Sequence, residues 1–274
     1  MLVAWAASSF AFAHEFWIET SPPAPKAGAP VTMTLRVGEF YTGELVGITT
    51  AHAVSLRALS AGRVDDLTAM VTAAIVPQLD MAFAPPGSHV LVYESHPSMV
   101  ELPADKFHAY LHDEGMDWVI RQREGAGTAA TPGRERFRRS AKALVRVGGR
   151  SDSASLRVAG QRIEIVPLDD PLAQAAGATL RFQLLFEGKP RAGVLVKAWH
   201  KQGAQVTTIR ATTDAQGRFA LTLPFAGSWM LNAVHMVAVT GAATVGSSNA
   251  EWDSFWASLS FTLGHSRGGG KPGH

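Results

Sequence analysis

The feature that most constrains this chain is an alternation of apolar and polar residues with a period of two, which begins at Ala29. The apolar members of its first run are Val31, Met33, Leu35 and Val37, separated by Thr32, Thr34 and Arg36. A period of two places successive side chains on opposite faces of a strand, so that one face is buried while the other contacts water. The pattern predicts a fold made mainly of antiparallel β-sheets.

The same period returns in the second half of the chain, in shorter runs separated by turn sequences. Its apolar positions include Leu180, Phe182, Leu184, Phe186, Phe219, Leu221, Phe255, Ala257, Leu259, Phe261 and Leu263. Regularly spaced short strands are typical of β-sandwiches. We therefore expect a mainly β protein with two sandwich domains of immunoglobulin-like or transthyretin-like type, an N-terminal domain at 14–168 and a C-terminal one at 169–264.

The alternation is interrupted near the middle of the first domain. Pro103 opens a segment in which Phe107, Tyr110 and Leu111 follow one another at helical spacing, and Gly115 ends it. Proline is favoured in the first turn of a helix and glycine just beyond its end. The sequence predicts a short helical insertion near 103–124.

The N-terminus has the form of an export signal. An apolar stretch from Leu2 to Phe12 runs into Ala11-Phe12-Ala13, the pattern of small residues that signal peptidase cleaves. We expect residues 1–13 to be removed, which leaves His14 first, and the mature protein to be periplasmic without membrane insertion. Residues 265–274 lack apolar periodicity and are expected to be a disordered tail.

Composition excludes several classes of function. The chain has no cysteine, so disulfide scaffolds, cysteine-ligated zinc and thiol catalysis are ruled out. Its 25 basic and 23 acidic residues give a formal charge of +2, which provides no strong field for a nucleic acid. The sequence also lacks the serine elbow, the zinc-protease helix and the phosphate-binding glycine loop, and we expect no enzymatic activity.

Four stretches together resemble a known family. They are His14-Glu15-Phe16-Trp17-Ile18-Glu19, Val100 to Phe107, Gly133-Arg134-Glu135-Arg136-Phe137, and Val234-His235-Met236 with Trp252 to Phe261. They resemble a periplasmic domain-of-unknown-function family that is associated with nickel and cobalt uptake (NikM-like), which implies a role in metal handling. Residues 186–190 and 213–219 are similar to the transthyretin-like, carboxypeptidase-regulatory sandwich, which implies a fold but no reaction.

Leader removal would give His14 two metal-binding groups, a free α-amine and an imidazole. Both lose their protons near neutral pH, and nitrogen ligands suit nickel, cobalt, copper and zinc. His235 is the first candidate for a second ligand, with a hydrogen-bonded core histidine as the alternative. Glu251 and Asp253 are candidate carboxylate ligands, with solvated loop acids as the alternative. A site between His14 and His235 would lie at the interface of the two domains, where pockets tend to form.

A second group of candidate ligands lies around the expected helix. It comprises His96, Glu101, His108 and His112. The last two residues are four positions apart, so both imidazoles can lie on one side of a helix. Without a third ligand in a matching position, an exposed helix face is the favoured interpretation.

These observations leave three functional hypotheses. The first is a periplasmic metal-binding protein, accessory to nickel or cobalt uptake, that holds a divalent transition metal through His14 and meets an inner-membrane transporter or an outer-membrane receptor. The second is a structural or adhesive module of the cell envelope that binds protein or glycan. The third is a copper oxidative enzyme, because an N-terminal histidine paired with another histidine also occurs in enzymes of that class.

Overall fold

The computed structural model describes residues 14–240 and 249–265. The expected leader and nearly all of the expected tail lie outside these residues. The described chain is mainly β and carries two α-helices, which confirms the predicted fold class. No helix in the described ranges is long and apolar enough to cross a membrane.

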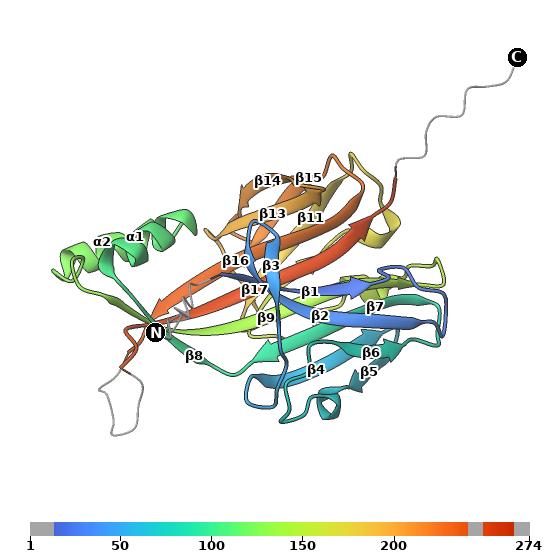
Figure 1. Cartoon of the computed structure of the whole chain (residues 1–274). Helices are drawn as coiled ribbons and strands as arrows, with labels where there is room; N and C mark the ends of the chain where they lie inside the picture. Colours follow the sequence, from blue (N-terminus) through green and yellow to red (C-terminus); the bar gives the residue numbers. More distant parts are fainter. Residues whose placement is uncertain (1–13, 241–248, 266–274) are drawn as a thin grey trace, which may run out of the picture.

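A nine-stranded sheet forms the centre of the molecule (Figure 1). Its strands run in the order β14-β13-β16-β17-β9-β7-β4-β5, and β8 pairs with β9 beside this path. Their bounds are β4 Ala53–Ser60, β5 Arg63–Asp66, β7 Gly87–Ser95, β8 Ser98–Leu102, β9 Gly133–Val147, β13 Leu195–Gln202, β14 Gln205–Thr212, β16 Gly227–Ala238 and β17 Trp252–Leu263.

Two four-stranded sheets pack against the central one. The first contains β1 Glu15–Ser21, β2 Pro30–Glu39, β3 Thr42–Val46 and β6 Leu79–Ala82. The second contains β10 Ile163–Pro167, β11 Thr179–Phe186, β12 Lys189–Pro190 and β15 Arg218–Thr222. Three short 3₁₀ segments, Thr68–Met70, Ser153–Leu156 and Pro171–Ala173, lie in the connections.

The two halves of the chain share the central sheet. Strand β17 pairs with β9 in parallel, from Trp252 opposite Glu135 to Ser260 opposite Ala143, whereas the other pairings in this sheet are antiparallel. Strand β10, which precedes the expected boundary at residue 169, pairs with β11 of the following half. The backbone hydrogen bonds therefore continue from one sandwich into the other.

The two outer sheets cover opposite faces of the central sheet because side chains alternate along its strands. In β7, Val90 and Val92 join the core made with β10, β11 and β15, while Leu91 and Tyr93 join the core made with β1, β2 and β6. Burial of apolar area on both faces is the main force that holds the three layers together. The first outer sheet also brings β1 across β9 and β17.

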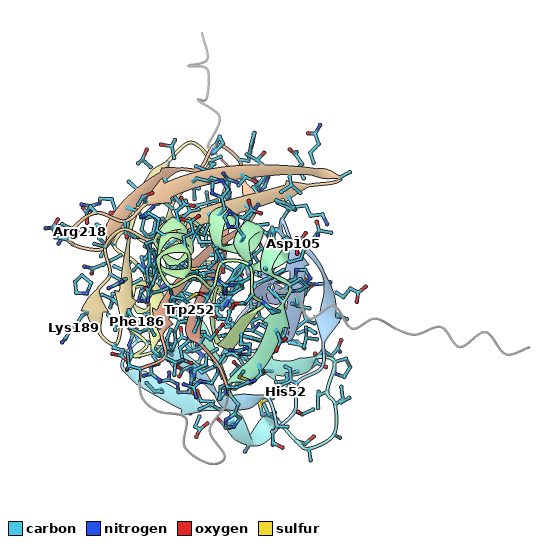
Figure 2. The ribbon with its side chains drawn as sticks, turned by 90° about the vertical axis from the view of Figure 1, so that its left-hand side faces the viewer. His52, Asp105, Phe186, Lys189, Arg218 and Trp252 are labelled. Atoms are coloured by element: carbon cyan, nitrogen blue, oxygen red, sulfur yellow. The ribbon has the colours of Figure 1, made fainter. Side chains whose placement is uncertain are left out.

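Two helices close one end of the central sheet, α1 Ala104–Asp113 and α2 Asp117–Gly125, and face the viewer in Figure 2. Between them Gly115 adopts a φ of 69°, which favours glycine and ends α1 as predicted. Phe107 and Leu111 point inward and pack with Trp252 and Trp256 of β17. The helices therefore cover the end of the face that β1 covers farther along.

Candidate functional site

The pairing of β1 with β2 places His14 against an acidic side chain. Glu15 lies opposite Gly38 in the antiparallel register, so the residue before Glu15 faces the one after Gly38. The structure shows the contact that this register implies, since Nδ1 of His14 lies 3.2 Å from Oε1 of Glu39. The first described residue is thus held beside a carboxylate at the edge of the first outer sheet.

Glu39 also lines a pocket of about 270 Å³ between the start of β1, helix α1 and strands β13 and β14. We call it the β1 pocket. Its charged and hydroxyl-bearing residues are Glu15, Glu39, Lys106, Tyr110, Asp113, Glu114, Lys197, Thr208 and Arg210. Acidic and basic side chains therefore face one another in a confined space.

Lys197 and Glu114 form the central ion pair of the β1 pocket. Nζ of Lys197 donates a hydrogen bond of 2.6 Å to Oε1 of Glu114, and both residues are buried. Burial raises the pKa of Glu114, although the charge of Lys197 opposes this. Strand β13 of the second half is thereby joined across the pocket to the residue that directly follows α1 in the first half.

Glu15 extends the acidic group toward the N-terminus. Burial, reinforced by repulsion from Glu114, raises its pKa to about 7, while Lys197 acts in the opposite direction. The Oε2 atoms of Glu15 and Glu114 are buried, and neither has a hydrogen-bond partner within the described ranges. Buried polar atoms without partners are uncommon in native proteins and often mark places where water or a ligand binds.

A third carboxylate, Glu135, is buried beneath the helices. Its Oε1 accepts a hydrogen bond of 3.3 Å from the hydroxyl of Tyr110 and a second from Ser254, which also accepts one from the indole of Trp256. Burial raises the pKa of Glu135 to about 7, against the effect of the hydrogen bonds from Ser254 and Tyr110. Tyr110, which also lines the β1 pocket, links the two groups of residues.

The structure does not bring His14 and His235 together. His235 belongs to the face of β16 that packs toward β11, where its ring lies 4.7 Å from that of Phe186. β1 and His14 lie over the opposite face of the central sheet. An interface site with both imidazoles is thus not assembled here, and the ligand role of His235 stays a prediction.

Glu251 and Asp253 contact arginines of β9 instead of histidines. Asp253 accepts two hydrogen bonds of 2.6 Å from Arg136 and one of 3.1 Å from Arg138, and Glu251 accepts one of 2.9 Å from Arg134. Burial alone would raise the pKa of Asp253, but the bonds from Arg136 and Arg138 lower it. Both carboxylates stabilise the parallel pairing of β17 with β9.

The secondary candidates lie on the surface in and around α1. His96, Glu101, His108 and His112 are all exposed. His112 makes an ion pair of 2.9 Å with Asp117, and the hydrogen bond between them raises the pKa of His112. Across residues 14–240 and 249–265, no three histidine, aspartate or glutamate side chains are arranged to hold a metal ion.

Sequence reasoning missed most of the β1 pocket. Glu15 lies within one of the stretches that carry the family resemblance, but Glu39, Glu114 and Lys197 belong to no motif that the sequence indicates. The available signal was weak: Lys197 is a charged residue between Val196 and Ala198 in an apolar strand, which suggests a buried partner. That partner is 83 positions away, and no local pattern identifies it.

The fold and the pocket define a mainly β protein of sandwich type with buried acidic groups under its first strand. The chain belongs to the family DUF4198, a domain of unknown function, whose model matches residues 11–237. No curated protein sequence matches the chain significantly.

Solved structures resemble the chain only distantly. A tetra-tandem repeat from the extending region of a large adhesion protein is 11% identical with a TM-score of 0.22, over 92% of this chain and 49% of that one. A mutant Salmonella alpha-2-macroglobulin is 11% identical with a TM-score of 0.21, over 92% and 16%. This chain thus spans about half of the adhesion structure, and scores this low carry no argument about function.

Proposed function

We propose that this is an exported protein that binds a divalent transition metal at its processed N-terminus and serves nickel or cobalt uptake. The observation that carries the proposal is the contact of 3.2 Å between His14 Nδ1 and Glu39 Oε1 at the β1 pocket. An imidazole and a carboxylate at this separation can both coordinate one ion after a small side-chain rotation. Export through the leader 1–13 would place the site in the periplasm.

The donor set suits a borderline divalent ion. Cleavage after Ala13 adds the α-amine of His14 to its imidazole, and Glu39 supplies an oxygen ligand. Two side chains and a terminal amine thus give three donors, and water or a chelating cargo would complete the shell. Copper binds such nitrogen donors most tightly in the general affinity order, so the choice of nickel or cobalt rests on the NikM-like resemblance and on metal supply.

A protein that serves metal uptake must pass its metal ion to a partner protein. A metal held at the edge of a pocket by three donors remains open to exchange, as a carrier requires, whereas structural sites are closed by four protein ligands. The proposed recipient is an inner-membrane transporter or an outer-membrane receptor. The adhesive and the copper-oxidase hypotheses predict different results from the metal-carrier hypothesis in the binding experiment described next, so that experiment distinguishes the three.

Mature protein that begins at His14 is expected to bind Ni(II), Co(II) or Cu(II) with one-to-one stoichiometry at pH 7 in isothermal titration calorimetry. One additional residue before His14 converts the amine into an amide, and Glu39→Gln removes the oxygen ligand. Each change should weaken binding at least about tenfold, an effect of roughly 1.4 kcal/mol. Glu44→Gln, an exposed carboxylate on β3, is the matched control and should leave affinity unchanged.

The absence of saturable binding in the mature protein would eliminate the metal proposal and favour the adhesive one. Equal affinities of the native and extended proteins would show that the amine is not a ligand. Peroxide consumption by the copper-loaded protein, with cleavage of a polysaccharide, would support the oxidase instead.

A further inference from the structure

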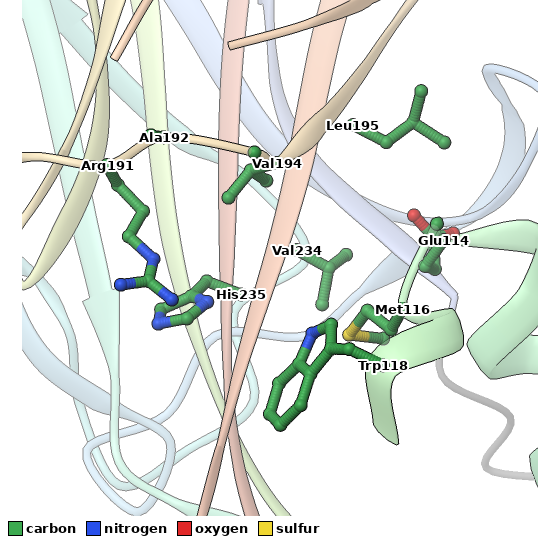
Figure 3. Close-up of a pocket in the computed structure, with 11 residues that line it drawn as sticks. Glu114, Met116, Trp118, Arg191, Ala192, Val194, Leu195, Val234 and His235 are labelled. Carbon is green, nitrogen blue, oxygen red and sulfur yellow. The ribbon is translucent and has the colours of Figure 1, made fainter. Parts of the chain in front are cut away.

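A second pocket, also of about 270 Å³, lies at the edge of β16. β13 pairs with β16 only from His200 to Val196, which lies opposite Ala233. Beyond that point the chain at 191–194 is not paired with β16, and this segment and the turn between α1 and α2 both line a space beside the strand. The side chains labelled in Figure 3 line the space between them, and we call it the β16 pocket.

One end of the β16 pocket is positively charged. The exposed side chain of Arg191 lies beside the ring of His235 (Figure 3), and Arg191 makes no ion pair within the described ranges. His235 is only 3% exposed, and its Nε2 has no hydrogen-bond partner among those residues. Burial, together with the charge of Arg191, lowers the pKa of His235 to about 4, so its ring is neutral at pH 7 and one nitrogen carries a proton.

The opposite wall of the pocket is apolar. The indole of Trp118 is 39% exposed, which is unusual for so large an apolar side chain, and it faces the pocket near Met116 and Val234 (Figure 3). The indole also meets Trp252 edge to face at 6.0 Å, which fixes its position. A flat apolar group can therefore pack against a preformed surface.

The acidic residues near this pocket are already paired. Glu114, which also lines it, is held by Lys197 at 2.6 Å, and Glu187, whose charge acts on His235, is bound by Arg162 at 2.8 Å. Arg191 is thus left as the cation that can accept an external anion. A divalent metal is disfavoured here because the guanidinium repels it.

We propose that the β16 pocket binds a small carboxylate that carries a flat apolar group. Arg191 would hold the carboxylate through paired N–H donors, the imidazole of His235 would donate or accept one further hydrogen bond, and the apolar group would pack on Trp118. Free aromatic acids and the C-terminal phenylalanine of a peptide share this chemistry. The site shares no ligand with the His14 metal site, so either proposal can fail alone.

Benzoate and acetyl-Gly-Phe are suitable probes for the two sources, with benzyl alcohol and acetyl-Gly-Phe-amide as their uncharged analogues. Addition of these acids to ¹⁵N-labelled protein, followed by NMR, should shift the indole N–H signal of Trp118. The signal is assigned by its absence from the spectrum of Trp118→Phe. We expect at least one acid to saturate with a Kd of about 1 mM, or about −4 kcal/mol, and to bind at least roughly tenfold more tightly than its uncharged analogue.

Arg191→Gln should weaken binding of the acid at least roughly tenfold. Arg218→Gln changes another exposed arginine of the same half and should leave the affinity for the acid unchanged. Saturation by benzoate alone would identify a free acid as the ligand, and saturation by the peptide alone would identify a chain terminus. Failure of both acids to shift the Trp118 signal would overturn the proposal. Equal binding of an acid and its uncharged analogue, or equal affinities of the two arginine variants, would do the same.

Discussion

Replacing Lys142 by methionine is expected to lower the free energy of unfolding by about 3–5 kcal/mol. Lys142 of β9 and Glu164 of β10 are each 1% exposed, and Nζ lies 2.8 Å from Oε2. Methionine has a similar length but no charge, so Glu164 would remain buried without its counter-ion. Urea unfolding of the variant and of the wild type measures the difference.

Further hydrogen bonds to Glu164 explain why neutralising its carboxylate would not restore the stability of the variant. Its carboxylate also accepts hydrogen bonds of 2.9 Å from the backbone N–H groups of Ala159 and Gly160. These bonds hold the chain that leads from the central sheet into the second outer sheet. Protonation of Glu164 in the variant would weaken all of them, because a neutral carboxyl is a poorer acceptor.

Two further variants test this explanation. The double variant Lys142→Met/Glu164→Gln should be more stable than Lys142→Met, since an amide needs no counter-ion and retains one acceptor. Arg162→Met removes one member of the half-exposed pair with Glu187 and should cost less than about 1 kcal/mol. Similar losses in Lys142→Met and Arg162→Met would contradict the importance of the buried pair.

Local sequence patterns predicted the strands and the helix but not their partners. The alternation through Leu180–Phe186 and Phe255–Leu263 became β11 and most of β17, and Pro103 and Gly115 flank α1 as expected. Period and turn residues act over a few positions, so the sequence reports them directly. The parallel pairing of β17 with β9 joins residues about 117 apart, as in the bond between Arg136 and Asp253, and depends on the packing of whole layers.

The same distinction explains the outcome for the candidate site. His14 was predicted as a ligand because its chemistry depends on its position next to the expected cleavage point. Glu39 becomes its neighbour only through the β1–β2 register. Glu251 and Asp253 were predicted as candidate carboxylate ligands, with loop acids as the alternative, because their arginine partners lie on a distant strand that no local pattern identifies. Buried ion pairs such as Lys142 with Glu164 are similarly difficult to predict from sequence, since a charged residue considered alone is expected to lie on the surface.

Replacing Glu135 by glutamine is expected to stabilise the protein at pH 8 and to have little effect at pH 5. The folded-state pKa of Glu135 is about 7, mainly because of burial and partly because of Glu114, against an ordinary value of 4.5. The folded state therefore binds the proton more tightly than the unfolded state. This contribution is complete below pH 4.5 and is lost as the pH rises through 7, with a total of about 3 kcal/mol.

Glutamine is neutral at both pH values and can still accept the hydrogen bonds of Tyr110 and Ser254 through its oxygen. The unfolding free energy of Glu135→Gln should therefore decrease less between pH 5 and pH 8 than that of the wild type. The difference between the two decreases should be up to about 3 kcal/mol. Glu101→Gln changes an exposed carboxylate on the adjacent strand β8 and should retain the pH dependence of the wild type. If Glu135→Gln also retains that dependence, Glu135 is ionised in the folded protein at pH 5. Its burial would then be compensated by water or a cation rather than by a proton.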